Sequence, residues 1–204
     1  MKLAQATFPI AITPVEPGGG VPCIRFSHEG GITMSQLVAL SVSIGLLGGI
    51  ATILYLKLGL LIWAGFIAWA CFFHSGGDGN ALKNTIVGNT FGAVCAWVAA
   101  LIILSFPMAE SLGLPVWAGI VVGITVLVLC LAAHVKALSS IPASVYGYAA
   151  VFAYLLQTAD SMTKDRLMSA GRGNALIVVI ASMAIGALFG LASGRLGGAL
   201  TAKS

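Results

Sequence analysis

The stretch MSQLVALSVSIGLLGGIATILYL at residues 34–56 decides the class of fold, because it contains no charged side chain over a membrane-spanning length. A helix rises about 1.5 Å per residue, so crossing a hydrocarbon core of about 30 Å takes about 20 apolar residues. This stretch therefore predicts a transmembrane helix.

The composition of the whole chain agrees with that prediction. Of 204 residues, 59% are hydrophobic and 8% are charged, and the mean hydropathy is +1.04. Soluble domains have about 25% charged residues. This composition excludes a soluble enzyme, a nucleic-acid-binding module and a disordered protein. The net charge of +4 is small and no basic cluster is present, so we expect the lipid bilayer, and not nucleic acid, as a partner.

Five further apolar stretches follow, which predicts an all-α, polytopic membrane helix bundle of about six transmembrane segments. The predicted segments cover residues 34–56, 58–74, 84–106, 115–134, 141–158 and 174–194. The second and fifth are short, so the alternative is five spans and one re-entrant segment buried among the others.

Six spans would place both termini on one side of the membrane. That side would have six basic residues: Lys2, Arg25, Lys83, Lys136, Arg195 and Lys203. The other side would have four: Lys57, Lys164, Arg166 and Arg172. Basic residues are enriched on the cytoplasmic side, so this count favours cytoplasmic termini.

Residues 1–33 differ in kind from the transmembrane domain predicted for residues 34–204. They contain four prolines and the run Gly18-Gly19-Gly20, and they lack the apolar core of a secretory signal. We expect a disordered or surface-lying tail. The alternative is that Met34 is the true start of the protein.

The two halves of the chain resemble each other at three places in the same order. The pair Gly45 and Gly49 matches Gly119 and Gly123, residues 62–66 (IWAGF) match residues 141–145 (IPASV), and residues 91–93 match residues 185–187. Three spans per unit is an odd number, so the units would form a 3+3 inverted repeat. Such repeats place a substrate path where the two units meet.

Glycine pairs at four-residue spacing recur along the chain. Small residues on one face allow helix backbones to approach closely. The pairs predict either tight packing inside one protomer or a dedicated oligomer interface, and we expect a homo-oligomer. The pairs are Gly45/Gly49, Gly88/Gly92, Gly119/Gly123, Gly186/Gly190, Gly190/Gly194 and Gly194/Gly198.

No Asp, Glu, Lys or Arg falls clearly inside a predicted span. Buried charges are typical of proton relays and ion-coupled pumps, so their absence argues against both. Passage of a small neutral or weakly polar solute remains open.

Amides, aromatic side chains and one histidine are the candidates for lining such a path. Thr85 and Asn89 share a helix face, and the Asn89 amide must form either a helix–helix hydrogen bond or part of a pore. His74 precedes a glycine-rich turn as an interfacial residue or a gate, and the aromatic residues form either a constriction or ordinary core. The candidates are Trp63, Phe66, Trp69, His74, Asn84, Asn89, Tyr146 and Tyr148.

The residues offer no enzyme chemistry. The chain has no H-E-x-x-H, G-x-S-x-G or P-loop motif, and its three histidines are scattered. The four cysteines have neither disulfide-scaffold density nor C-x-x-C spacing. We expect no catalytic residue, no metal and no cofactor.

Residues 58–66 (LGLLIWAGF), followed by Phe73 and Gly76-Gly77, resemble the signature of a bacterial inner-membrane family known as domain of unknown function 1097. The resemblance covers about residues 34–195. It implies an inner-membrane location, and it transfers no activity and no functional residues. Our leading hypothesis is a channel or facilitator for a small neutral or weakly polar solute. The alternative is a non-transporting assembly subunit that packs through its glycine-rich helix faces.

Overall fold

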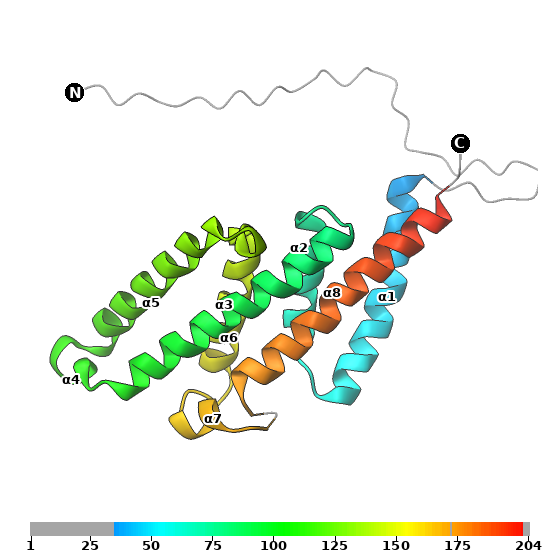
Figure 1. The fold of residues 1–204 in the computed structure, drawn as a ribbon. Helices are drawn as coiled ribbons and strands as arrows, with labels where there is room; N and C mark the ends of the chain where they lie inside the picture. The colour runs from blue at the N-terminus through cyan, green and yellow to red at the C-terminus, as the bar shows by residue number, and fades with distance from the viewer. Residues whose placement is uncertain (1–34, 172, 202–204) are drawn as a thin grey trace, which may run out of the picture.

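The computed structural model describes residues 35–171 and 173–201, and its elements are helices joined by turns (Figure 1). The predicted all-α class is therefore confirmed. The predicted N-terminal tail and the role of Met34 lie outside the described residues.

Each predicted apolar segment contains one main helix. The elements are α1 (Gln36–Leu58), α2 (Ile62–His74), α3 (Gly79–Ser105), α4 (Met108–Leu112), α5 (Leu114–Leu131), η1 (Ala132–His134), η2 (Lys136–Leu138), α6 (Ile141–Gln157), α7 (Lys164–Met168) and α8 (Ala175–Leu200). Four of the described helices are long and apolar enough to cross a membrane: α1, α3, α5 extended by η1, and α8. The helix α2 is shorter and also apolar.

The helix α3 begins at Gly79, five residues before the predicted boundary at residue 84. The cause is a cap that hydropathy does not detect. The Asp78 carboxylate accepts a hydrogen bond from the backbone N–H of Ala81 at 2.7 Å, which satisfies one of the free donors of the first turn. Gly76 and Gly77 have positive φ values of 114° and 72°, which allow the chain to reverse direction after α2.

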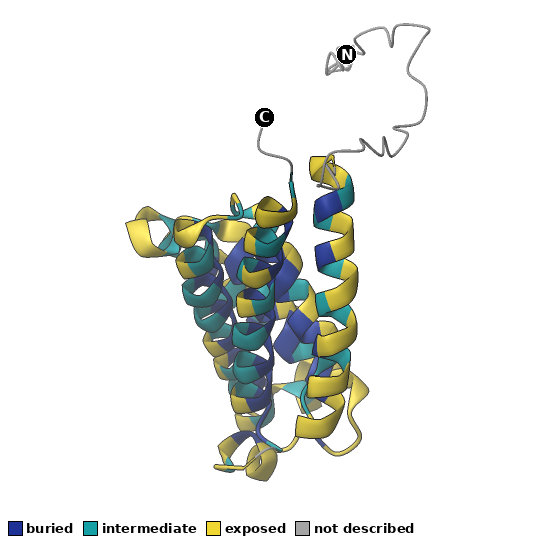
Figure 2. Ribbon diagram, turned by 90° about the vertical axis from the view of Figure 1, so that its right-hand side faces the viewer, coloured by how far each residue is buried: buried dark blue, intermediate teal, exposed yellow. Residues whose placement is uncertain are grey.

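The helices form two layers (Figure 1). The first contains α5, α3, α8 and α1 in that order. The short helices α6 and α2 form the second, where α6 packs mainly on α3 and α2 packs mainly on α8. In the most apolar window of each helix, 44% of α3 and of α8 is buried, against 17% of α1 and 11% of α5. The centre of the bundle therefore consists of α3 and α8, and α1 and α5 are its outer helices. Figure 2 shows how much of α1 is exposed.

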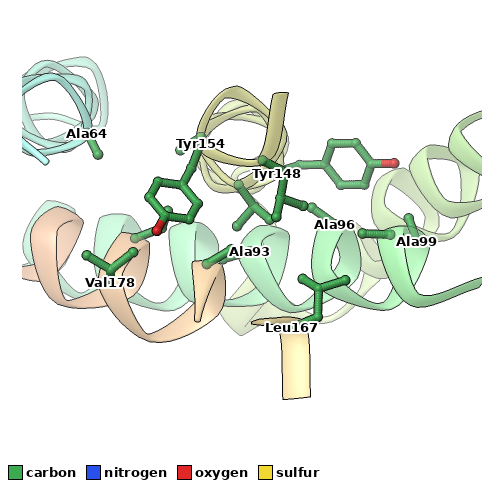
Figure 3. Close-up of a cluster of buried hydrophobic side chains, with 14 of the residues drawn as sticks. Ala64, Ala93, Ala96, Ala99, Tyr148, Tyr154, Leu167 and Val178 are labelled. Atoms are coloured by element: carbon green, nitrogen blue, oxygen red, sulfur yellow. The ribbon is translucent and has the colours of Figure 1, made fainter. Parts of the chain in front are cut away.

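Small side chains on α3 allow α6 to approach it closely. Ala93, Ala96 and Ala99 are fully buried, and larger side chains of α6 lie over this face of α3 (Figure 3). Tyr148 points to one side of α6, toward α5, and Tyr154 points to the other side, toward Val178 of α8 (Figure 3). Close backbone packing of this kind holds membrane helices together by van der Waals contact.

The first turn of α1 and the last turns of α8 lie at the same end of the bundle, where the backbone of Gly197 is beside Leu40. The turn between α2 and α3 and the connection between α5 and α6 are also at this end (Figure 1). The connections that contain α4 and α7 are at the opposite end.

Candidate functional site

The crossing of α3 and α6 brings two backbones into direct contact. A methyl group on Gly92 would collide with the carbonyl of Ser144, and one on Gly147 would collide with the backbone of Asn89. A third glycine, Gly88, lies against Ala143. Only glycine fits at these positions, because the space that a Cβ atom would need is already filled by the other helix.

Three polar side chains buried at this crossing or next to it on α3 have no hydrogen-bond partner from the described protein. Thr85 is 0% exposed, Asn89 is 3% exposed and Ser144 is 1% exposed. The unpaired atoms are Thr85 Oγ1, Asn89 Oδ1, Asn89 Nδ2 and Ser144 Oγ. We call these three residues the α3–α6 polar cluster.

The cluster lies well inside the bundle. Asn89 is about 15 Å along α3 from Gly79, in a helix about 40 Å long, at 1.5 Å per residue. The thiol of Cys71, from α2, is near the Thr85 hydroxyl, although the two do not form a hydrogen bond of standard geometry. Leaving a buried polar group unpaired costs about 1–3 kcal/mol. The cluster thus has hydrogen-bonding capacity that the described protein does not use.

The crossing of α2 and α8 has the same close approach but a different polar pattern. A methyl group on Gly186 would collide with the backbone of Gly65. The Tyr55 hydroxyl of α1 donates to the carbonyl of Ser182. The Ser182 hydroxyl accepts from the N–H of Leu61 at 3.0 Å and donates to the carbonyl of Val178 at 2.7 Å. The hydrogen-bonding groups named at this crossing are paired.

Two of the predicted aromatic residues are buried and hydrogen-bonded. Trp69 Nε1 donates to the Ser193 hydroxyl at 3.0 Å, which connects α2 to α8. The Tyr148 hydroxyl forms a hydrogen bond of 2.8 Å with Thr125 of α5. Trp63 and Phe66 are instead exposed on the outside of α2, at 36% and 42%.

The remaining predicted residues lie near one end of the bundle. His74 Nδ1 and the Tyr146 hydroxyl are 3.1 Å apart and form an exposed hydrogen bond between α2 and α6. Asn84 is half-buried and lines a surface cavity together with Lys83 and Lys136. Of the eight predicted residues, only Asn89 belongs to the α3–α6 polar cluster.

Sequence reasoning paired Asn89 with Thr85 through their four-residue spacing, but it missed Ser144 as a site residue. The available signal was the alignment of Ser144 with Gly65 in the internal repeat, which indicates a position where two helix backbones meet. The alignment does not say which helix Ser144 contacts, so its place beside α3 could not be predicted from the sequence.

The cluster offers neutral hydrogen-bond donors and acceptors and no charge. Within the described ranges, no group of three His, Cys, Asp or Glu side chains is arranged to hold a metal ion. Hydroxyl and amide groups of this kind bind a small neutral molecule through hydrogen bonds.

These features define a helical membrane protein whose central helices cross through small residues. The chain belongs to the family described as "Protein of unknown function (DUF1097)", whose family model matches residues 41–198. It is 28% identical over 176 residues to "Inner membrane protein YcdZ" of Escherichia coli (strain K12), covering 84% of this chain and 91% of that protein. No solved structure matches the chain significantly. The relative and the apolar helices together support a multi-pass protein of the inner membrane.

Proposed function

We propose that this protein is a non-enzymatic facilitator that passes a small neutral or weakly polar solute through the α3–α6 polar cluster. The observation that carries the proposal is the set of four buried polar atoms without a partner. A solute that forms hydrogen bonds would replace part of its lost hydration there, which lowers the barrier to crossing the apolar core.

The close contact at the crossing implies a closed state. The backbones of Gly92 and Ser144 touch, so α3 and α6 must separate for a solute to pass. The exposed hydrogen bond between His74 and Tyr146 connects the end of α2 to α6 near the cluster and would break when α6 moves. It is a candidate gate.

We also propose that α1, α2 and α3 form one unit of an inverted repeat, that α5, α6 and α8 form the other, and that all six helices cross the membrane. Each unit has an outer helix, a short helix and a central helix, and the short helix of each packs on the central helix of the other. Successive helices of each unit run in alternating directions (Figure 1).

The strongest support for the repeat is that aligned residues make corresponding contacts. The alignment of the two halves pairs Gly65 with Ser144 and Gly92 with Gly186. Gly186 touches the backbone of Gly65, and Gly92 touches the backbone of Ser144. This reciprocal pair is what an inverted repeat predicts, and it supports the proposal.

The proposed topology has cytoplasmic termini, from the count of six basic residues against four. Reporter fusions at the C-terminus test this directly. Activity of a periplasm-dependent phosphatase in that fusion would contradict it, and fluorescence of a cytoplasm-dependent reporter would support it.

The transport proposal is tested by stopped-flow swelling of proteoliposomes in urea and in glycerol, two small neutral solutes that form hydrogen bonds. Asn89→Leu is expected to lower the protein-dependent permeability about tenfold, which corresponds to the loss of about one hydrogen bond. Thr85→Val removes one hydroxyl from the cluster without changing its shape and should produce a smaller loss for the same solute.

The matched control is Thr90→Val, the same substitution on the same helix at a half-buried residue outside the cluster. It should leave permeability unchanged. Wild-type vesicles that swell no faster than empty ones in either solute would overturn the proposal for this class of solute. Equal losses of permeability in Thr85→Val and Thr90→Val would show that the solute does not pass through the cluster.

A second candidate function is assembly with another membrane protein or with a second copy. Gly45 and Gly49 on α1, and Gly119 and Gly123 on α5, face open space: a Cβ atom added there would meet no atom of the described residues within 4 Å. These glycine pairs are therefore available to a helix outside the protomer, whereas Gly88, Gly92 and Gly186 are used inside it.

The assembly role is tested by the mass of the detergent-solubilised protein from light scattering, compared between wild type and Gly49→Leu/Gly123→Leu. Dissociation of a homo-oligomer in the double variant would support a homo-oligomeric interface through these faces. A wild type that is monomeric in detergent and in nanodiscs would contradict it.

A further inference from the structure

A cavity of 640 Å³ opens at the end of the bundle where α3 begins and η2 packs against it. It is separate from the α3–α6 polar cluster. None of the residues that line it is acidic. The lining residues are Asn80, Lys83, Asn84, Lys136, Ala137 and Ser139.

The charge around this cavity is one-sided. Lys83 and Lys136 are two of the three described Lys and Arg residues at this end, and the third is Arg195. The acidic residue nearest in sequence is Asp78, whose carboxylate already accepts a hydrogen bond from the first turn of α3. Two ammonium groups that line the same cavity repel each other unless an anion lies between them.

The neutral lining residues suit a phosphate group. Asn80 and Asn84 each offer an amide N–H₂ group, and Ser139 offers a hydroxyl, so several donors can share one anion. The positive end of the α3 dipole, in the same place, also favours negative charge. The cavity lies at the end of membrane-length helices, where the phosphates of lipid headgroups are found, and basic pockets at that level bind anionic lipids.

We propose that this cavity is a binding site for a phosphate-bearing anion, supplied either by the headgroup of an anionic phospholipid or by free phosphate. Lys83 and Lys136 provide the charge, and the two asparagines and Ser139 provide hydrogen bonds. The site is independent of the solute path, so each proposal can fail without the other.

The test measures binding to the full chain in a neutral detergent, by native mass spectrometry and by the shift in unfolding temperature. The probes are phosphatidylglycerol, phosphatidylcholine with the same acyl chains, and inorganic phosphate. Stabilisation by phosphatidylglycerol alone assigns the lipid headgroup, and equal stabilisation by inorganic phosphate assigns a free anion. Equal binding of the two lipids, without any effect of phosphate, would overturn the proposal.

Substitutions then locate the site. Lys83→Gln/Lys136→Gln should weaken binding of the preferred anion roughly 30-fold, at about 1 kcal/mol for each basic residue near the membrane surface. The controls are Arg195→Gln, which removes an exposed charge at the same end outside the cavity, and Lys57→Gln, at the opposite end. Both controls should bind as the wild type does. A double variant that keeps wild-type affinity, or controls that lose as much, would assign binding to general surface charge and contradict the site.

Discussion

The α2–α8 crossing and the α3–α6 crossing each bring two helix backbones into contact, but their polar side chains differ. Both crossings depend on glycine, at Gly186 in the first and at Gly92 in the second. At the α2–α8 crossing, the hydroxyls of Tyr55 and Ser182 are hydrogen-bonded to the protein. At the α3–α6 crossing, the side-chain amide of Asn89 has no hydrogen-bond partner within the described residues. The α2–α8 crossing therefore uses its hydrogen-bonding groups within the protein, whereas the α3–α6 crossing has hydrogen-bonding groups that are not used.

The difference indicates where function is to be sought. Burial of an unpaired polar group has a free-energy cost that packing alone does not recover, so the unpaired cluster is the place in the bundle where the proposed solute path can be tested. The paired crossing serves as an internal reference, because equivalent substitutions at the two crossings separate a structural effect from a functional one.

The largest expected effect is on stability, from the glycines that both crossings share. Gly92→Ala and Gly186→Ala should each lower the free energy of unfolding by about 1–3 kcal/mol, because the added methyl group meets backbone that cannot move aside easily. The measurement is thermal or denaturant unfolding in mild detergent. Gly123→Ala is the matched control, since Gly123 faces open space, and it should be neutral or slightly stabilising. Similar losses of stability at all three positions would contradict the distinction between glycines that pack inside the protomer and glycines that face open space.

A smaller effect, and of opposite sign, is expected at the unpaired crossing. Asn89→Leu should raise the free energy of unfolding by about 1 kcal/mol in the absence of solute, because it removes a buried amide that has no partner. The expected gain in stability is at the low end of the roughly 1–3 kcal/mol cost of an unpaired polar group, because the close packing of α3 and α6 leaves little room for the leucine side chain. The same unfolding measurement applies. A loss of stability instead would show that the native protein pairs this amide, and the contrast between the crossings would disappear.

At the paired crossing, removal of a single hydrogen bond should destabilise the protein. Trp69→Phe removes one donor to α8 and also part of a buried ring, so it should cost more than the loss of a hydrogen bond alone. Tyr55→Phe removes one donor to α8 and little else. The expected loss is about 0.6 kcal/mol and at most about 1.7 kcal/mol, the range of hydrogen bonds between membrane helices. These variants are unfolded under the same conditions as Asn89→Leu. We expect the free energy of unfolding to fall at the paired crossing and to rise at the unpaired one, and a gain in stability from Tyr55→Phe would contradict this.

The smallest stability effect is expected from the exposed hydrogen bond between α2 and α6. His74→Gln should change the free energy of unfolding by less than about 0.5 kcal/mol, as is usual for exposed side chains. Its effect should instead appear as faster solute passage in the swelling assay, because the bond restrains α6. A variant with unchanged permeability in a protein that does conduct would show that His74 is only an interfacial residue.

The sequence predicted much of the fold because bilayer physics imposes simple rules on composition. The apolar runs at residues 34–56 and 174–194 indicated helices, and α1 and α8 occupy those places. Boundaries were less accurate, since α3 starts at the Asp78 cap and not at the edge of its apolar run. Hydropathy measures transfer to lipid, whereas helix ends are set by local hydrogen bonds.

Site residues were harder to predict, because an apolar helix can present any of its faces to the core. Trp63 and Trp69 lie on the same helix and are both aromatic, yet Trp63 is exposed and Trp69 is buried against Ser193. Glycine pairs were equally ambiguous, since the spacing of Gly45 and Gly49 is the same as that of Gly88 and Gly92. Only the second pair packs inside the protomer.

The sequence by itself determined that this is a helical membrane protein, because it contains several apolar runs of about the length that a helix needs to cross a bilayer, and a helix satisfies its own backbone hydrogen bonds in lipid. It also determined that the charged residues lie at or beyond the ends of the spans predicted from the sequence. The tertiary structure alone decided which helices are central, which glycines form the crossings, and that Ser144 joins Thr85 and Asn89 in one cluster. Those contacts connect residues far apart in the chain, and the close approach of two backbones is a property of both helices together.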